Sequence, residues 1–122
     1  MLLKNVNLFI IEITNKYFMS TILNFAIFPT DKGDKGSSEY VSKVLKMIDE
    51  SGVPYKLNPM GTSIETDTLE EALDIVNKAY KVLEPVSQRV YSAITIDIRK
   101  GRKKGMTQKI QSIENRIGEV NK

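Results

Sequence analysis

Hydrophobic and polar residues alternate along four stretches of this chain, at positions 21–29, 53–60, 62–66 and 89–99. A period of two is typical of a strand with one buried face, because successive side chains point to opposite sides. The pattern therefore predicts four strands. In the last of them we expect five side chains to point inward: Val90, Ser92, Ile94, Ile96 and Ile98.

Between the first two strands, apolar residues recur at helical spacing. This predicts a helix over residues 37–51. The hydroxyls of Ser37 and Ser38 are expected to cap its N-terminus, and Gly52 follows its last turn, where a residue with positive φ is common.

A second helix is predicted after Thr68 and Glu71, which have the spacing of a capping box. We expect a broad buried face on this helix, formed by Leu69, Ala72, Leu73, Val76, Ala79, Tyr80 and Leu83. A weaker apolar stripe predicts a third helix within residues 106–120, which packs on a sheet edge or on a neighbouring subunit.

The predicted order βαββαβ contains two split βαβ units. Such units fold as a four-stranded antiparallel sheet with both helices on one face, so we predict an α+β, ferredoxin-like fold with an added C-terminal helix. The other face of the sheet is then open and mixes polar residues with apolar ones such as Ala26, Phe28 and Met60. We expect self-association through this face; the alternative is a monomer with scattered exposed apolar residues.

The length of 122 residues fits one domain, which we place at residues 19–122. Residues 1–18 are interpreted as an N-terminal extension, because translation from Met19 would begin the first strand at once. Such an extension would form an extra edge strand or a flexible arm. A secretory signal is less favoured, since Glu12 interrupts the apolar run.

The composition excludes several classes of function. With no Cys and no His, the chain has no disulfide, thiol nucleophile or imidazole base, and we expect neither a metal nor a cofactor. The excess of cations lies largely in one run, Arg99 to Lys104, instead of a broad stripe, so no nucleic-acid partner is predicted. We interpret this run as a solvated linker; the alternative is a site that grips an anion. No apolar run approaches the roughly 18 residues of a membrane span, and we expect a cytoplasmic protein with no membrane partner.

Glu65 lies among β-branched residues at the end of the third predicted strand. A half-buried carboxylate is costly unless it is paired or hydrogen-bonded. Glu65 therefore needs either a salt bridge, for which Lys56 across the sheet is the candidate, or a ligand that donates hydrogen bonds to it.

Four segments carry a family resemblance: Ala26-Ile-Phe-Pro29, the Gly-rich loop that enters Ser37-Ser-Glu-Tyr-Val41, Ser51-Gly-Val-Pro-Tyr55, and Met60-Gly-Thr-Ser-Ile-Glu65. Over Ser20 to about Val120 the chain resembles the small thiamine-binding proteins, which bind thiamine or its hydroxymethylpyrimidine moiety. It departs from their pattern at Thr66, where a Gly is expected. The resemblance implies a ferredoxin-like homo-oligomer, often a tetramer, with a ligand site near subunit contacts. It does not imply catalysis, and we expect no enzyme.

The aminopyrimidine of such a ligand carries an amine beside a ring nitrogen, so a carboxylate can accept a charge-assisted hydrogen bond from it. We predict that Glu65 is this acceptor. The other predicted ligand contacts supply ring faces, hydroxyls and a close backbone approach, and they are Phe28, Ser37, Ser38, Tyr40, Met60, Gly61 and Thr62.

Three other functions fit parts of this pattern. The main alternative is an amino-acid-sensing regulatory domain, which would bind its effector at a subunit interface. An RNA-recognition domain is less favoured, since the third strand has no aromatic residue on which a base could stack. An enzyme that uses Glu65, Asp97 or Tyr40 is less favoured too, because no second carboxylate is spaced to pair with Glu65.

Overall fold

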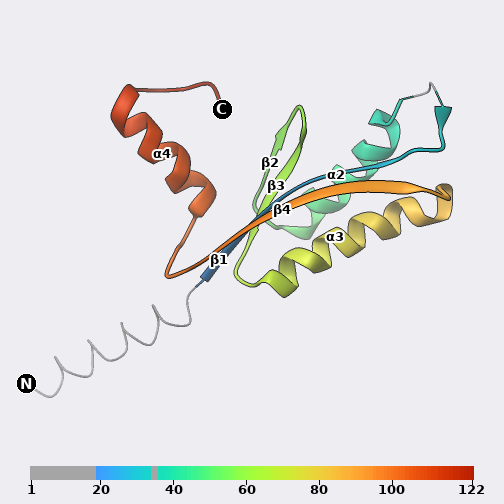
Figure 1. Cartoon of the computed structure of the whole chain (residues 1–122), viewed down its shortest axis with the longest axis horizontal. Coiled ribbons are helices and arrows are strands. Elements are labelled where there is room, and N and C mark those ends of the chain that lie inside the picture. Colours follow the sequence, from blue (N-terminus) through green and yellow to red (C-terminus); the bar gives the residue numbers. More distant parts are fainter. Residues whose placement is uncertain (1–18, 34–35) are drawn as a thin grey trace, which may run out of the picture.

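The computed structural model follows the predicted order βαββαβ and adds one C-terminal helix (Figure 1). It describes residues 19–33 and 36–122, so the predicted extension over residues 1–18 lies outside the described residues. The elements are β1 (Met19–Pro29), α2 (Ser38–Ser51), β2 (Tyr55–Asn58), β3 (Gly61–Thr66), α3 (Leu69–Leu83), the short 3-10 helix η2 (Glu84–Val86), β4 (Val90–Lys100) and α4 (Gly105–Ile117). Of the helices in the described ranges, none has the length and apolar character that crossing a membrane requires.

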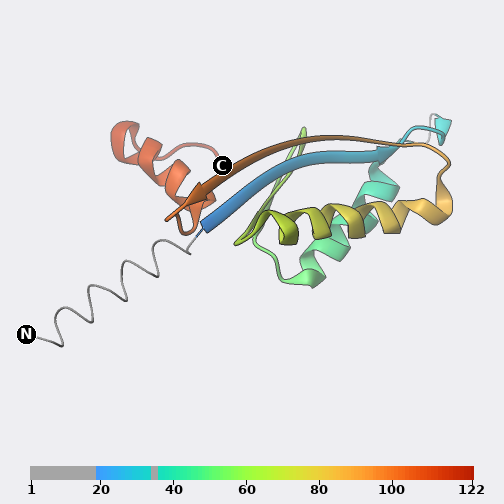
Figure 2. The same ribbon diagram turned by 60° about the horizontal axis from the view of Figure 1, so that its bottom comes forward.

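The four strands form one antiparallel sheet in the order β2-β3-β1-β4. Figure 2 shows α2 and α3 together on one face of this sheet, with α4 set apart at the end where β4 stops. The core lies between the sheet and the two helices and consists of Leu23, Phe25, Ile27, Val44, Ile48, Ile64, Ala72, Ile75, Ala79 and Leu83. The α+β, ferredoxin-like prediction is confirmed.

The helix ends confirm two predicted caps and correct a third. Gly52 has φ 80° after α2, and the hydroxyl oxygen of Thr68 accepts the N–H of Glu71 at 3.2 Å before α3. Ser37, in contrast, makes no side-chain capping bond, and the prediction of a hydroxyl cap is wrong. A capping side chain reaches back from an extended residue, whereas Ser37 already has helical angles (φ −92°, ψ −9°).

Two predicted buried faces are more exposed than expected. The isoleucines of β4 face the helix side of the sheet, as predicted, because Ile96 lies opposite the buried Leu23. Their side chains are nevertheless 40–44% exposed, at Ile94, Ile96 and Ile98. On α3 the same holds for three predicted core residues, which are 37–44% exposed: Leu69, Leu73 and Tyr80. The reason is that β4 is the edge strand and the helices cover mainly β1 and β3.

Gly61 lies close to another backbone segment, which belongs to β1, while the predicted close approach of a ligand to Gly61 stays a prediction. A Cβ at Gly61 would lie 2.7 Å from the carbonyl oxygen of Phe25. We therefore expect Gly61→Ala to force β1 and β3 apart locally and to lower the free energy of unfolding by about 1 kcal/mol. Chemical denaturation checks this, with Met60→Ala as the control, since that side chain is exposed; equal stability of the two variants would contradict the argument.

Candidate functional site

A hollow of about 600 Å³ lies where β1 continues past its last pairing with β3, beside the start of α2 and the tip of the β2–β3 hairpin. We call it the apolar groove. Most of its wall is hydrophobic and comes from Phe25, Ala26, Ile27, Phe28, Val41, Val44, Leu45, Leu57, Pro59, Met60, Tyr91 and Ala93. The side-chain polar groups on its wall belong to Ser37, Ser38, Asn58 and Thr62.

Two aromatic rings, one exposed and one partly buried, and two exposed flexible apolar side chains stand around this groove. The rings of Phe28 and Tyr91 have centroids 5.5 Å apart and are tilted by 43°. Met60 is 84% exposed, and Leu57 and Tyr91 are also largely exposed. Such surfaces, with a few polar groups beside them, are typical of sites for small planar ligands.

The structure brings six of the eight predicted ligand residues to the apolar groove, namely Phe28, Ser37, Ser38, Met60, Gly61 and Thr62. Tyr40 instead packs against the core, and the ammonium groups of Lys32 and Lys43 each lie 5.7 Å from its ring centroid. Sequence reasoning missed Asn58, whose carboxamide oxygen accepts the N–H of Met60 at 2.9 Å. The Asn-Pro pair at the predicted hairpin was the available signal for this turn.

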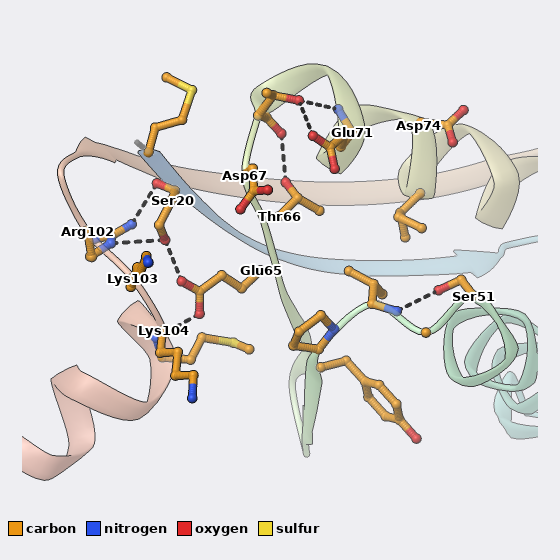
Figure 3. A pocket seen from close by; sticks show the side chains of 18 of the residues that line it. Ser20, Ser51, Glu65, Thr66, Asp67, Glu71, Asp74, Arg102, Lys103 and Lys104 are labelled. Carbon is orange, nitrogen blue, oxygen red and sulfur yellow. Dashed lines mark hydrogen bonds between the residues drawn. The ribbon is translucent and has the colours of Figure 1, made fainter. Parts of the chain in front are cut away.

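Glu65 borders a different, larger hollow of about 1,270 Å³ between the end of β3, the starts of α3 and α4, and the loop after α2 (Figure 3). Its carboxylate accepts hydrogen bonds from the hydroxyl of Ser20 at 2.5 Å and from the backbone N–H groups of Gly105 at 2.6 Å and Met106 at 3.1 Å. Free N–H groups at a helix start favour a negative acceptor. Glu65 therefore caps α4 across about forty residues of sequence.

The proposed bridge from Glu65 to Lys56 is wrong. Lys56 lies opposite Ser63 in the pairing of β2 with β3, two positions from Glu65. Among the salt bridges of residues 19–33 and 36–122, none joins these two side chains. The donors to Glu65 come from β1 and α4 instead.

Arg102 joins the same cluster and is buried, its side chain 5% exposed. Its guanidinium donates to the hydroxyl and carbonyl oxygens of Ser20 and to the carbonyl oxygen of Asp97, each at 3.1 Å, and to the Asp97 carboxylate at 2.8 Å. We call Ser20, Glu65, Asp97, Arg102 and Gly105 the Arg102 junction. For Arg102, the interpretation of a solvated linker is wrong.

Gly105 makes room for this guanidinium. A Cβ at Gly105 would lie 2.5 Å from Nε of Arg102 and 3.0 Å from Cδ1 of Ile22. The first residue of α4 must therefore be small if the Arg102 side chain is to pass beneath it. Nothing in the run of cations indicates which of them is buried. The one sequence signal near Arg102 is the pair of glycines, Gly101 directly before it and Gly105 three positions after it.

Both carboxylates of the junction are held ionised. Partial burial by itself raises the pKa of Glu65, but hydrogen bonds from Ser20, Met106 and Gly105 and the charge of Arg102 outweigh it, and the net pKa lies below its usual value. Hydrogen bonds from Lys109 and Arg102 lower the pKa of Asp97 to about 2. Such carboxylates are weak bases, and their contacts show a structural junction between β1, β3, β4 and α4.

The described part of the chain contains no cluster of metal-ligating side chains. No three His, Cys, Asp or Glu side chains gather there in a way that could hold an ion. The apolar groove supplies ring surfaces and neutral polar groups, and the Arg102 junction supplies charged contacts.

Comparison with known proteins agrees with the fold and the resemblance. The UPF0045 protein Mb1933 of Mycobacterium bovis is 32% identical over 96 residues, which cover 79% of this chain and 93% of that protein. Among solved structures, a hypothetical protein of Methanocaldococcus jannaschii has a TM-score of 0.67 and 29% identity, covering 77% of this chain and 95% of its own.

A Thermotoga maritima structure, provisionally named a thiamine biosynthesis/salvage protein, has a TM-score of 0.63 and covers 77% of this chain and 98% of its own. At 22% identity it supports the fold alone. The family model described as "Thiamine-binding protein" matches residues 23–114. This match spans most of the chain, from Leu23 in β1 through β4 and into α4, and the chain therefore belongs to the thiamine-binding protein family.

Proposed function

We propose that this chain binds thiamine or its hydroxymethylpyrimidine moiety without catalysis, in the apolar groove. The observation that carries the proposal is the groove itself, where Phe28, Tyr91 and Met60 surround a hollow of about 600 Å³ with neutral polar groups beside them. Its volume is in the usual range for small-ligand sites. Membership of the thiamine-binding family supports the choice of ligand.

The groups around the groove match the two parts of thiamine. Phe28 and Tyr91 offer ring faces for the flat pyrimidine, and their negative faces attract a cationic thiazolium by about 0.5–2 kcal/mol. The carboxamide oxygen of Asn58 accepts one hydrogen bond from the N–H of Met60, which leaves its amide N–H groups and a second lone pair for a ligand. These, with the hydroxyls of Ser37 and Ser38, can pair with a ring nitrogen and its neighbouring amine.

We also propose a homo-oligomer, with a tetramer as the expected size and the ligand near a subunit contact. Support comes from the open face of the sheet, where Ile22, Ala26 and Phe28 remain only half-buried in the single chain. The apolar groove includes part of this face, so a second copy placed there would lie close to the ligand.

The groove is tested by removing one ring and keeping the apolar volume. We expect Phe28→Leu to weaken hydroxymethylpyrimidine binding about three- to tenfold, the value of one aromatic contact. The matched control is Tyr55→Leu, which removes a ring from the wall of the other hollow. Isothermal titration calorimetry compares the two, and a larger loss from Tyr55→Leu would move the ligand to the hollow beside Glu65.

A further inference from the structure

One side of the molecule combines a free strand edge with an apolar surface. β4 is an edge strand of 11 residues, and its outer backbone groups have no partner strand in the sheet of the described residues. We define the β4–α3 surface as the six partly exposed apolar residues on this side: Leu69, Leu73, Tyr80, Ile94, Ile96 and Ile98.

These residues lie in one layer. Ile94 and Ile96 pair with Phe25 and Leu23, which point into the core, so the isoleucines lie on the helix side of the sheet. On α3, Glu71 and Asp74 line the hollow next to the exit of α2, so the opposite flank, with Leu69, Leu73 and Tyr80, is turned toward β4. Figure 1 shows α3 running alongside β4, and the two elements are in contact.

Over Val90 to Ile98 the edge has little of the usual protection against pairing. Natural edge strands are kept apart by charges, prolines or bulges, or they are covered. From Val90 to Ile98 the only charged residue is Asp97. Its carboxylate is already paired with Arg102 and Lys109, each at 2.8 Å. The cations Arg99 and Lys100 stand only at the C-terminal end of β4, so most of the edge is nearly uncharged. Beside the exposed isoleucines, this part of the edge is a surface for another strand.

We propose that two copies of this chain pair through antiparallel β4 strands about a two-fold axis at Ile96, which joins their sheets into one. The row formed by Ile94, Ile96 and Ile98 is self-complementary about this two-fold axis, as an isologous interface requires. Ile96 meets the partner's Ile96, and Ile94 meets the partner's Ile98. The exposed flanks of the two α3 helices then approach each other above the paired strands.

Charge favours a second copy in this register. On the open face of the sheet, Ala93 lies opposite the partner's Arg99 and Thr95 lies opposite the partner's Asp97, so no like charges are directly opposed. Shifting the axis by one residue to Asp97 would set two Asp97 side chains opposite each other, which is destabilising. Any other partner would need its own free strand with a matching apolar stripe.

The pairing also changes the ligand site, an extension that rests on the function proposed above. Ala93 and Tyr91 line the apolar groove. With the axis at Ile96, the partner's Arg99 lies beside Ala93 and diagonal to Tyr91, and it brings a guanidinium to the groove of the first subunit. Guanidinium groups bind phosphate strongly. The complete site then favours a phosphate ester of the aminopyrimidine.

The interface is tested by the mass of the full chain in sedimentation velocity at micromolar concentration. We expect Ile96→Lys and Leu73→Lys each to halve the mass, because each buries an ammonium group at the axis or beside it. The control is Ile113→Lys on α4, a similarly exposed isoleucine outside the surface, which should keep the wild-type mass. A wild-type monomer, or an unchanged mass for both β4–α3 variants, overturns the pairing. So does a chain that begins to associate only when residues 1–18 are removed, since that segment would then be the occupant.

A separate binding experiment tests the role of the partner's Arg99 in the ligand site. We expect Arg99→Gln to leave the mass unchanged and to weaken binding of hydroxymethylpyrimidine phosphate about tenfold, with little effect on the unphosphorylated compound. Equal effects on both compounds would contradict the role of the partner's Arg99. If no aminopyrimidine binds while Ile96→Lys still halves the mass, the interface stands and the proposed function fails.

Discussion

Arg102→Met is expected to lower the free energy of unfolding by roughly 2–4 kcal/mol, the largest effect of any single substitution considered for this chain. Met keeps most of the apolar length of the side chain but removes a guanidinium with four hydrogen bonds. The buried hydroxyl and carbonyl of Ser20 would lose a charged donor. Because Arg102 lies between β1, β4 and α4, the loss should also loosen α4. Chemical denaturation at a fixed protein concentration measures the change.

Lys109→Met is the matched control for this experiment. Lys109 contacts the same oxygen of Asp97 at the same distance of 2.8 Å, but its side chain is exposed. Exposed ion pairs contribute little to stability, so we expect almost no change. If Lys109→Met costs as much as Arg102→Met, the ion pair with Asp97 matters and the buried hydrogen bonds do not.

Glu65→Gln is expected to lower the free energy of unfolding by about 1–2 kcal/mol while ligand affinity stays the same. The amide keeps the shape of the side chain but removes the negative charge that accepts from Ser20, Gly105 and Met106. A charge-assisted contact at a helix N-terminus is worth about this much when it is only half-buried. Denaturation and calorimetric titration of the same sample separate the two effects, and a tenfold loss of affinity would restore Glu65 as a ligand contact.

The pH dependence gives this prediction a second signature. The pKa of Glu65 is lowered in the folded state, so its contribution to stability is present above the usual value of 4.5 and is lost as the pH falls through the folded value. The difference in unfolding free energy between wild type and Glu65→Gln should therefore be full at pH 7 and shrink below about pH 4.5. Asp97, with a pKa of about 2, adds a further loss between pH 3.8 and 2 in both proteins.

The sheet and its core could be predicted from the sequence because period-two alternation directly reports which side of a strand is buried. Leu23, Phe25 and Ile27 follow this rule. The exposure of Ile96 could not be predicted in the same way, since it depends on how far α3 reaches across the edge of the sheet. A local period records the side on which a residue lies and carries no information about what covers it.

The need of Glu65 for a partner was also readable from the sequence, since the carboxylate stands among β-branched residues. Its donors were not, because Ser20 and Gly105 reach it through tertiary structure from 45 and 40 positions away. Arg102 was hidden for a related reason. Within a run of five cations, only the path of the chain after β4 decides which side chain turns inward.

The most direct test of the proposed function is calorimetric titration of the full chain with hydroxymethylpyrimidine, thiamine and a panel of amino acids. The account predicts a dissociation constant well below millimolar for at least one aminopyrimidine, a weaker signal for every amino acid, and a further loss of affinity in Phe28→Leu but not in Glu65→Gln. Binding of all aminopyrimidines weaker than millimolar, or tighter binding of an amino acid, would contradict it and favour an amino-acid-sensing domain instead.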